Sequence, residues 1–421
     1  MADYLHPLMC CRELEEYIAE QADGYARLGA SGCFFDDSAL IFRINQVELF
    51  AHGRFRMNSS PRINVAISAH GFGHLTQTVA VLQALSHRYE NMTLRIQCAL
   101  ERSIIAARLG KHDFEHERIP MDVGLVQPDP LNVDLSSTLE AYAVFHQRFD
   151  QKIKTESLKL KDWGADIVLS DISYLALAAA ASAAIPGIAL ASLTWDHIVK
   201  AYFDLDAPKV HDWYQQIQEA YRLSTLALLP EPALVGQIFE QVKHIAPVYI
   251  PGQRKSIIRD QLGLKTDDTR ALVLCSLGGI ASANIPTEAM LKQRDFHWIV
   301  DMDRTLPPAD HMHTIAQLAD WPYRDILASV DAVIGKPGYG TAVEVAAHDL
   351  PFVYTRRGHF PDEPIISAWL DRHTRSLEIS NADWFAGNFT QPLETLREKP
   401  RKPGLAFNGA EQAAEIISDF L

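Results

Sequence analysis

Residues 65–78 read Val65-Ala-Ile-Ser-Ala-His70-Gly71-Phe72-Gly73-His74-Leu-Thr76-Gln-Thr78. The apolar start is typical of a buried strand, and the Gly-x-Gly element is typical of a tight turn. Apolar residues at Val79, Leu82 and Leu85 predict a helix directly afterwards. The sequence thus places an imidazole at a helix N-terminus, beyond the carboxyl end of a strand, where open α/β sheets bind their ligands. Since an imidazole exchanges a proton near pH 7, His74 is a candidate acid–base group.

From residue 62 onward, strand-like and helix-like segments alternate, which predicts βαβ units and parallel sheets. The strands of a first series are expected at 63–69, 93–99, 166–170, 187–193 and 225–229. Those of a second series are expected at 271–276, 297–300, 332–334 and 351–354. The fold class is therefore α/β, with two Rossmann-like domains that face each other across a cleft.

Prolines interrupt residues 229–252 repeatedly, and we therefore expect the interdomain link there. The predicted units are an N-terminal extension over 1–56, a first domain over 57–250, a second over 251–408, and an amphipathic helix over 409–421. Residues 1–56 have two interpretations, an extension ahead of a natural start at Met57 or an added strand-and-helix lobe.

Composition excludes some classes of protein. The chain has 421 residues and a formal net charge of -14, which disfavours a nucleic-acid binder. Five cysteines without regular spacing suggest reduced thiols in a cytoplasmic protein rather than a disulfide framework. The uncharged residues 172–194 are broken by Pro186-Gly187, so they are interpreted as helix, turn and strand rather than a membrane span.

A glycine-rich loop, Gly335-Lys336-Pro337-Gly338-Tyr339-Gly340-Thr341, follows a predicted strand and opens a predicted helix. Its glycines let backbone N–H groups approach a ligand, and the helix N-terminus favours an anion such as a pyrophosphate. Lys336 would add a full positive charge. A second glycine turn, Gly278-Gly279, is expected to face the first. The spacing fits neither the Walker loop nor the dinucleotide fingerprint.

Acidic residues near this loop have two interpretations. Thr341 and Glu344 have the spacing of a capping box, so Glu344 either caps its own helix or accepts hydrogen bonds from a ribose. Asp362-Glu363-Pro364 either starts a helix or binds sugar hydroxyls. The triplet Asp301-Met-Asp303 has the pattern of a manganese site in another fold, but a two-domain α/β pattern does not require one.

Taken in order, the motifs resemble the inverting GT-B glycosyltransferases, and especially the N-terminal glycosyltransferase-like region of plant L-arabinokinases. The resemblance covers residues 62–420 and rests on five motifs in order. These are Ala69 to His74, Ser170-Asp171, Leu193-Thr194-Trp195-Asp196, Gly335 to Thr341, and Phe360 to Pro364.

The resemblance implies a role for each motif. His74 would be the general base, and Asp171 would orient it and balance its charge. The second domain would bind a nucleotide-diphosphate sugar, with UDP as the family's usual carrier. The residues expected to bind the nucleotide and its phosphates are Gly278, Gly279, Lys336, Gly338, Gly340, Thr341 and Glu344. Those expected at the donor sugar are Asp362 and Glu363, and those expected on the acceptor side are His70, Phe72, Trp195 and Asp196.

The resulting prediction is an enzyme of the hexosyl- or pentosyltransferase class that transfers a sugar to an unknown acceptor, a small molecule, glycan or lipid-linked compound. No cofactor and no metal ion are expected, because the glycine loop and the helix dipole would stabilise the leaving diphosphate. The alternatives are an epimerase or hydrolase of nucleotide sugars and a non-catalytic nucleotide-sugar sensor. Pro364 stands where many family members have a donor-binding glutamine, which leaves the identity of the sugar open.

Overall fold

The computed structural model describes residues 60–421 except 279–284, 303–305, 308 and 359, together with three strands nearer the N-terminus. The chain forms two compact units, Met1–Asn58 and Ser59–Leu421. In the first unit, β1 (Cys33–Asp36), β2 (Ala39–Ile44) and β3 (Val47–Ala51) form an antiparallel sheet in the order β1-β2-β3.

The second unit begins with a seven-stranded sheet in which every pairing is parallel. Its strands, in spatial order, are β10 (Val242–Ile245), β9 (Leu226–Pro230), β8 (Gly187–Leu190), β7 (Ile167–Asp171), β4 (Arg62–Ile67), β5 (Thr93–Gln97) and β6 (Glu115–Glu117). The central strands are buried along their length except at Arg62, the first residue of β4, as is typical of parallel strands covered on both faces.

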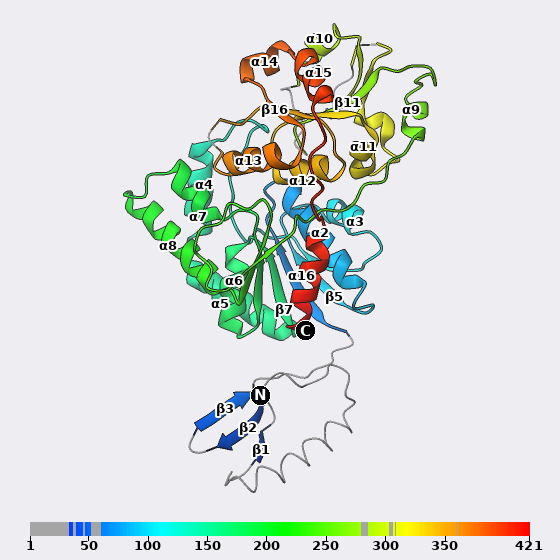
Figure 1. The fold of residues 1–421 in the computed structure, drawn as a ribbon. Helices are drawn as coiled ribbons and strands as arrows, with labels where there is room; N and C mark the ends of the chain where they lie inside the picture. Colours follow the sequence, from blue (N-terminus) through cyan, green and yellow to red (C-terminus); the bar gives the residue numbers. More distant parts are fainter. Residues whose placement is uncertain are drawn as a thin grey trace. The chain divides into compact units, whose positions relative to one another are not determined.

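Helices cover both faces of this sheet (Figure 1). One face packs against α4 (Leu135–Phe145), α5 (Phe149–Trp163), α6 (Tyr174–Ala183), α7 (Trp195–Tyr202) and α8 (Pro208–Arg222). The other packs against α2 (Phe72–Ser86), α3 (Arg102–Leu109) and α16 (Gly409–Ser418). Residues 172–194 form α6 and β8, as predicted, and no helix in the described part of the chain is both long and apolar enough to cross a membrane.

A second, six-stranded sheet is also parallel throughout. Its strands, in spatial order, are β13 (Met312–Thr314), β12 (Phe296–Val300), β11 (Ala271–Ser276), β14 (Ala332–Gly335), β15 (Phe352–Tyr354) and β16 (Ser376–Glu378). Gly335 is required where β14 meets β11, because a Cβ there would lie 2.3 Å from the carbonyl oxygen of Ser276.

The helices of this second domain are also divided between the two faces of its sheet. On one face lie α9 (Ile257–Gln261), the 3-10 helix η1 (Ile315–Leu318), α11 (Tyr323–Ser329), α12 (Tyr339–Ala347) and α13 (Glu363–His373). On the other face lie α10 (Thr287–Met290), α14 (Asn381–Ala386) and α15 (Thr390–Glu398). The two α/β domains predicted from the sequence are therefore confirmed.

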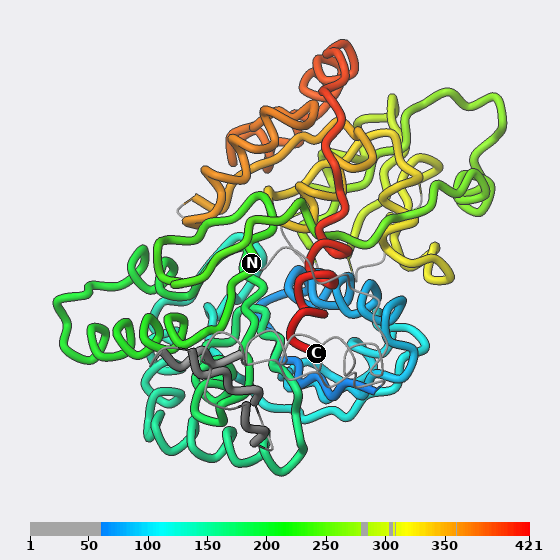
Figure 2. Tube along the Cα trace, turned by 60° about the horizontal axis from the view of Figure 1, so that its bottom comes forward, coloured from blue at the N-terminus to red at the C-terminus, as the bar shows by residue number. Residues whose placement is uncertain are grey.

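The last helix belongs to the core of the first domain although it follows the second in sequence. The chain runs back across the molecule, and α16 lies beside α2 and the first sheet (Figures 1 and 2). Ala413, Ala414 and Ile417 are buried there, and Gln412 accepts a hydrogen bond from the backbone N–H of Ala246 at 2.8 Å. This crossing ties the two domains together at a second point besides the link near residue 250.

Candidate active site

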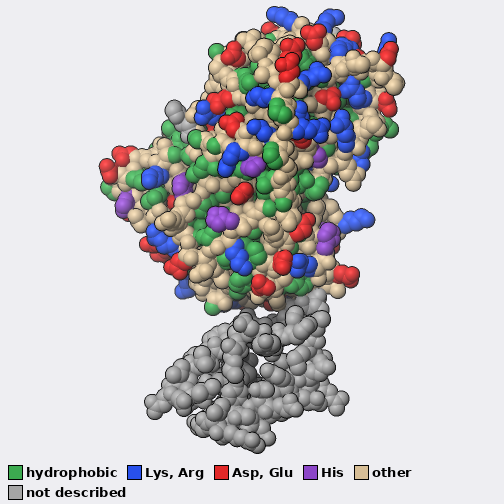
Figure 3. Space-filling view, viewed as in Figure 1, with side chains coloured by type: hydrophobic (Ala, Val, Ile, Leu, Met, Phe, Trp, Pro, Cys, Tyr) green, Lys and Arg blue, Asp and Glu red, His purple; other side chains and the backbone are tan. Residues whose placement is uncertain are grey.

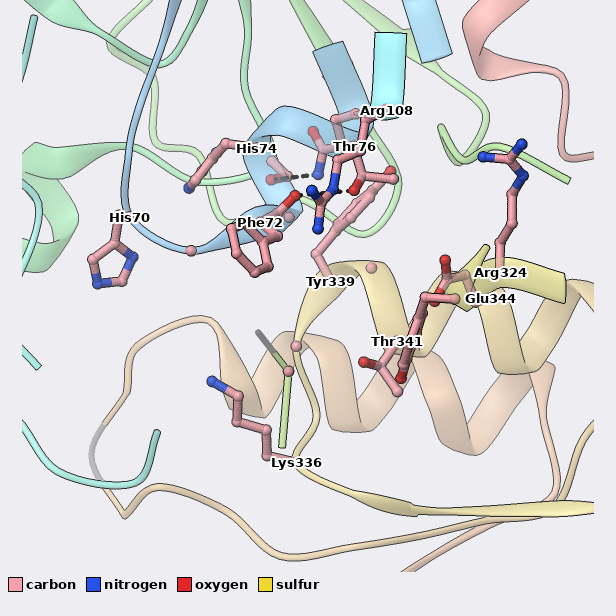
Figure 4. A pocket seen from close by; sticks show the side chains of 18 of the residues that line it. His70, Phe72, His74, Thr76, Arg108, Arg324, Lys336, Tyr339, Thr341 and Glu344 are labelled. Atoms are coloured by element: carbon pink, nitrogen blue, oxygen red, sulfur yellow. Dashed lines mark hydrogen bonds between the residues drawn. The ribbon is translucent and has the colours of Figure 1, made fainter. Parts of the chain in front are cut away.

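A cavity of about 690 Å³ lies between the two domains, at the carboxyl edges of both sheets. Its upper wall in Figure 4 comes from residues 70–74 and the first turns of α2, and its lower wall from residues 336–341 and α12. The N-termini of α2 and α12 thus face each other. Backbone N–H groups at both ends and the positive ends of two helix dipoles make this space suited to an anionic ligand.

His74 lies in the first turn of α2, because that helix begins at Phe72. Its Nδ1 lies 2.8 Å from Oδ1 of Asp171, which is the last residue of β7 and fully buried. The other carboxylate oxygen accepts a hydrogen bond from Thr78 Oγ1 at 3.0 Å. The neighbouring strands β4 and β7 bring the two residues together across 97 positions of sequence. Asp171 therefore fixes the ring so that Nε2 remains for a ligand.

The electrostatics of this pair suit a base. Burial by itself lowers the pKa of His74, but the charge of Asp171 and its hydrogen bond outweigh burial and raise the pKa above its ordinary value. A proton accepted at Nε2 would leave an imidazolium that the buried carboxylate stabilises. The paired His74 is therefore suited to accept a proton from a hydroxyl group held in the cavity.

A second buried carboxylate, Asp122, supports the same wall and was missed by the sequence analysis. It accepts hydrogen bonds from Ser68 Oγ at 3.2 Å, Ser173 Oγ at 2.9 Å and Trp195 Nε1 at 3.1 Å. It thereby connects the segments that carry both histidines and Trp195. Asp122 lies in no regular element and has no recognisable motif, so no sequence signal pointed to it.

His70 also lines the cavity but differs from His74 electrostatically. Burial, the charge of His74 and the cations Arg357 and Lys336 lower the pKa of His70 to about 3. The ring lies edge-on to Trp195, with centroids 5.1 Å apart, and is stacked near Phe360 at 6.2 Å. His70 is therefore a neutral group at pH 7, which suits a hydrogen-bonding role better than that of a base.

The other acceptor-side residues are placed differently from one another. Phe72 lines the cavity, and the guanidinium of Arg108 lies 4.3 Å from its ring centroid. Trp195 is fully buried behind His70 and does not line the cavity. Asp196 is buried beside His197, also away from the cavity. The structure thus brings His70 and Phe72, but not Trp195 or Asp196, to the cavity surface.

The glycine loop of the second domain leaves room at the start of α12. Gly338 is the N-cap of the helix, and no side chain caps it. A Cβ built at Gly338 or Gly340 would meet nothing within 4 Å, so these positions open onto empty space rather than onto packed protein. Lys336 and Thr341 line the same space. Uncapped N–H groups beside a lysine are the arrangement that binds phosphate oxygens.

Lys336 is a cation without an ion-pair partner among the described residues, and its side chain points into the space between the walls (Figure 4). Burial and the nearby charge of Arg357 lower its pKa to about 7, although Asp362 and Glu363 oppose this effect. An anion bound beside Lys336 would hold it in the charged form.

One interpretation of Glu344 is wrong. Because α12 begins at Tyr339, Thr341 lies inside the helix and Glu344 cannot form a capping box with it. Glu344 instead lines the cavity one turn further along, where burial raises its pKa to about 7 against the opposing charge of Arg324. Gly278 lies across from this loop, with a φ of +74° and 3.7 Å between its built Cβ and Lys336 Cε. Gly279 lies outside the described residues.

The two acidic residues at the start of α13, Asp362 and Glu363, have different surroundings. Asp362 lines the cavity, and burial raises its pKa to about 6. Glu363 is buried behind it, where it accepts hydrogen bonds from Arg357 at Nε (2.6 Å) and at the backbone N–H (3.0 Å). Only Asp362 could therefore contact a sugar, while Glu363 holds the loop before the helix. Pro364 lies in the first turn of α13, where a helix accommodates proline.

Further polar residues of the first domain that were not singled out from the sequence also line the cavity: Thr76, Gln77, Arg108, Gln127 and Ser192. Gln77 lies one turn after His74 on α2, so helical spacing from His74 could have found it. Arg108 comes from the last turn of α3. Gln127 comes from an irregular segment that periodicity does not describe.

Comparison with solved structures identifies the fold as GT-B. A glycosyltransferase of kitacinnamycin has a TM-score of 0.59 and 16% identity, covering 86% of this chain and 99% of that chain. Arabidopsis thaliana UGT89C1 complexed with quercetin has a TM-score of 0.59 and 12% identity, covering 86% and 100%. The calicheamicin glycosyltransferase CalG4 has a TM-score of 0.52 and 14% identity, covering 86% and 94%.

In sequence, the chain is similar to L-arabinokinase of Arabidopsis thaliana, with 29% identity over 367 residues. The alignment covers 84% of this chain and 34% of the relative, so the chain spans about a third of the length of that protein. No family model matches the chain. The resemblance predicted from the motifs, to GT-B glycosyltransferases and to plant L-arabinokinases, is confirmed.

Proposed function

We propose that this protein binds a nucleotide-diphosphate sugar in the interdomain cavity and transfers the sugar, with inversion, to a hydroxyl group of an acceptor. The observation that carries the proposal is the position of His74, paired with buried Asp171 and facing the uncapped start of α12 across the cavity. A base and an anion site lie on opposite walls, as a displacement between a hydroxyl and a diphosphate requires.

In the proposed reaction, the acceptor oxygen attacks the anomeric carbon from the side opposite the diphosphate. The new C–O bond forms as the bond to the diphosphate oxygen breaks, which inverts the configuration. The hydroxyl proton passes to Nε2 of His74, because a sugar or phenol hydroxyl is a poor nucleophile until a base removes that proton. Asp171 stabilises the imidazolium that results.

The leaving diphosphate takes the electron pair of the broken bond and gains negative charge. The N–H groups at the start of α12 and the ammonium of Lys336 would stabilise that charge. The proposed reaction therefore does not call on a metal ion. One neighbour in fold, Arabidopsis thaliana UGT89C1, has been solved in complex with UDP, with a TM-score of 0.56. This supports a uridine nucleotide as the first donor to test.

Glu344 and Asp362 complete the proposed donor site. Glu344 lies near the start of α12 and would accept hydrogen bonds from the ribose hydroxyls. Asp362 lies at the end of the cavity that holds Lys336 and would contact the hydroxyls of the transferred sugar. Carboxylates of this kind accept two hydrogen bonds from neighbouring hydroxyls at little geometric cost.

A ligand screen followed by turnover measurements tests the proposal. Thermal shift with a panel of nucleotides and nucleotide sugars, including ATP with L-arabinose, should show stabilisation by a nucleotide-diphosphate sugar. His74→Ala should abolish turnover while keeping the donor-induced shift. His87→Ala is the matched control, because His87 follows the last turn of the same helix and is exposed.

Three results would contradict the proposal in different ways. Binding without turnover by wild type with any donor would favour a non-catalytic sensor. Release of free sugar or of an isomerised donor, with no transfer product, would favour a hydrolase or epimerase. Turnover of ATP with L-arabinose would favour the activity in the name of the arabinokinase relative.

A further inference from the structure

Three buried polar atoms on the first-domain side of the cavity have no hydrogen-bond partner in the described part of the chain. They are Nε2 of His70, Oε1 of Gln77 and Nε2 of Gln127. All three residues line the cavity. Buried polar atoms in folded proteins are nearly always bonded, so a group of three in one wall points to a ligand that supplies the missing partners.

The surrounding contacts hold these groups in place. The amide of Gln77, 3% exposed, donates from Nε2 to Ser192 Oγ at 3.1 Å, which leaves its oxygen as an acceptor. The ring of His70 is fixed between Trp195 and Phe360. The segment of Gln127 is held by a hydrogen bond from the N–H of Val126 to Thr138 at 3.0 Å. The site is therefore preorganised rather than dependent on loose side chains.

The three groups differ in their hydrogen-bonding character. Gln77 offers an acceptor, and Gln127 offers a donor. The neutral imidazole of His70 offers either one, according to its tautomer. A hydroxyl group both donates and accepts, so a set of hydroxyl groups can satisfy all three. Aromatic surface or a carboxylate would leave at least one of them unbonded.

We propose that the acceptor is a small polyhydroxylated molecule, a sugar or a polyol, whose additional hydroxyls bind His70, Gln77 and Gln127 while one hydroxyl meets His74. This inference rests on the proposed function and specifies its acceptor. The attacking oxygen bonds to the anomeric carbon, its proton goes to His74, and the diphosphate departs with the electron pair. A phenol with a single hydroxyl would leave three buried groups unsatisfied. Sites built to bond a hydroxyl reject analogues that lack it by about 10⁴- to 10⁵-fold.

An acceptor panel tests this class directly. With a donor that stabilises the wild type, monosaccharides and polyols should be glycosylated with a kcat/KM at least about 100-fold higher than that of simple phenols. Faster turnover of simple phenols would overturn the acceptor class and leave the donor proposal standing. Absence of a shift with any nucleotide-diphosphate sugar would overturn both.

Substitution separates a binding role from a structural one. Gln77→Met should raise the acceptor KM about tenfold or more, with the donor KM unchanged, because one hydrogen bond to the acceptor is lost. Gln127→Met should do the same. Gln83→Met is the matched control, since Gln83 lies on the same helix, bonds the carbonyl of Arg108 at 3.4 Å and does not line the cavity. An acceptor KM that changes equally in all three variants, or in none, would overturn the assignment.

Discussion

Replacing Asp171 with asparagine removes the negative charge behind His74 with little change of shape. The affected contact is the 2.8 Å hydrogen bond between a fully buried carboxylate and Nδ1. A hydrogen bond to a charged group contributes about 1.5–3 kcal/mol, which is roughly 10- to 150-fold in rate. If the amide also imposes the wrong tautomer, the whole contribution of the base is lost, about 10²- to 10⁴-fold. We therefore expect kcat to fall by between about 10-fold and 10⁴-fold.

The other properties of Asp171→Asn should change little. Asp171 does not line the cavity, so the donor KM should stay within about twofold. The hydroxyl of Thr78, 3.0 Å from the second oxygen, can turn to accept a bond from the amide, which preserves the fold. Stopped assays of donor consumption would give kcat and KM, and thermal unfolding would report stability.

The double variant His74→Ala with Asp171→Asn gives the sharpest comparison. If the two residues act as one unit, it should be no slower than His74→Ala alone. The reasoning is refuted if Asp171→Asn keeps more than half of the wild-type kcat while His74→Ala is inactive, or if the two losses multiply in the double variant.

Three further predictions concern the same cavity. Because the pKa of His74 is raised and the base must be unprotonated, kcat/KM should increase with pH through a limb above pH 6.5, and a limb below 6 would contradict the assignment. Gly340→Ala should leave the fold as stable or about 0.5–1 kcal/mol more stable, while weakening the binding of a nucleoside diphosphate. Gly335→Ala should instead destabilise the protein, because the added Cβ would clash with the carbonyl oxygen of Ser276. Calorimetry measures the binding, and thermal unfolding measures the stability. Arg108→Ala should reduce the extra affinity for a nucleoside diphosphate over its nucleoside. Arg102→Ala should not, because Arg102, on the same helix α3, lies outside the cavity with its guanidinium over the ring of Phe114.

The fold was largely predictable because both domains are parallel sheets whose buried strands give apolar runs. The strands that line the centre of each sheet were all found, and their bounds agree with the structure to within a few residues. The edge strands β6, β10, β13 and β16 were missed. Each has only three or four residues, and three of the four carry charged or polar side chains along most of their length, so periodicity gives no signal.

The wall around His74 was predictable in part. Motif order pointed to His74 and Asp171, and the structure places them in contact. The capping-box interpretation of Glu344 was wrong, because α12 begins at Tyr339 and Thr341 therefore lies inside the helix. Trp195 stands in a motif yet is buried behind His70, while Gln127 stands in none and reaches the cavity. Which side of a loop faces a cleft depends on tertiary packing, and a single sequence does not encode it in any local pattern.

The central claim is that His74 activates an acceptor hydroxyl toward a nucleotide-diphosphate sugar bound at the start of α12. It is tested most directly by proton NMR of the product formed from an α-linked donor and a sugar acceptor. The account predicts a β-linked product with wild type and no product with His74→Ala. An α-linked product, or an unchanged rate of product formation with His74→Ala, would contradict it.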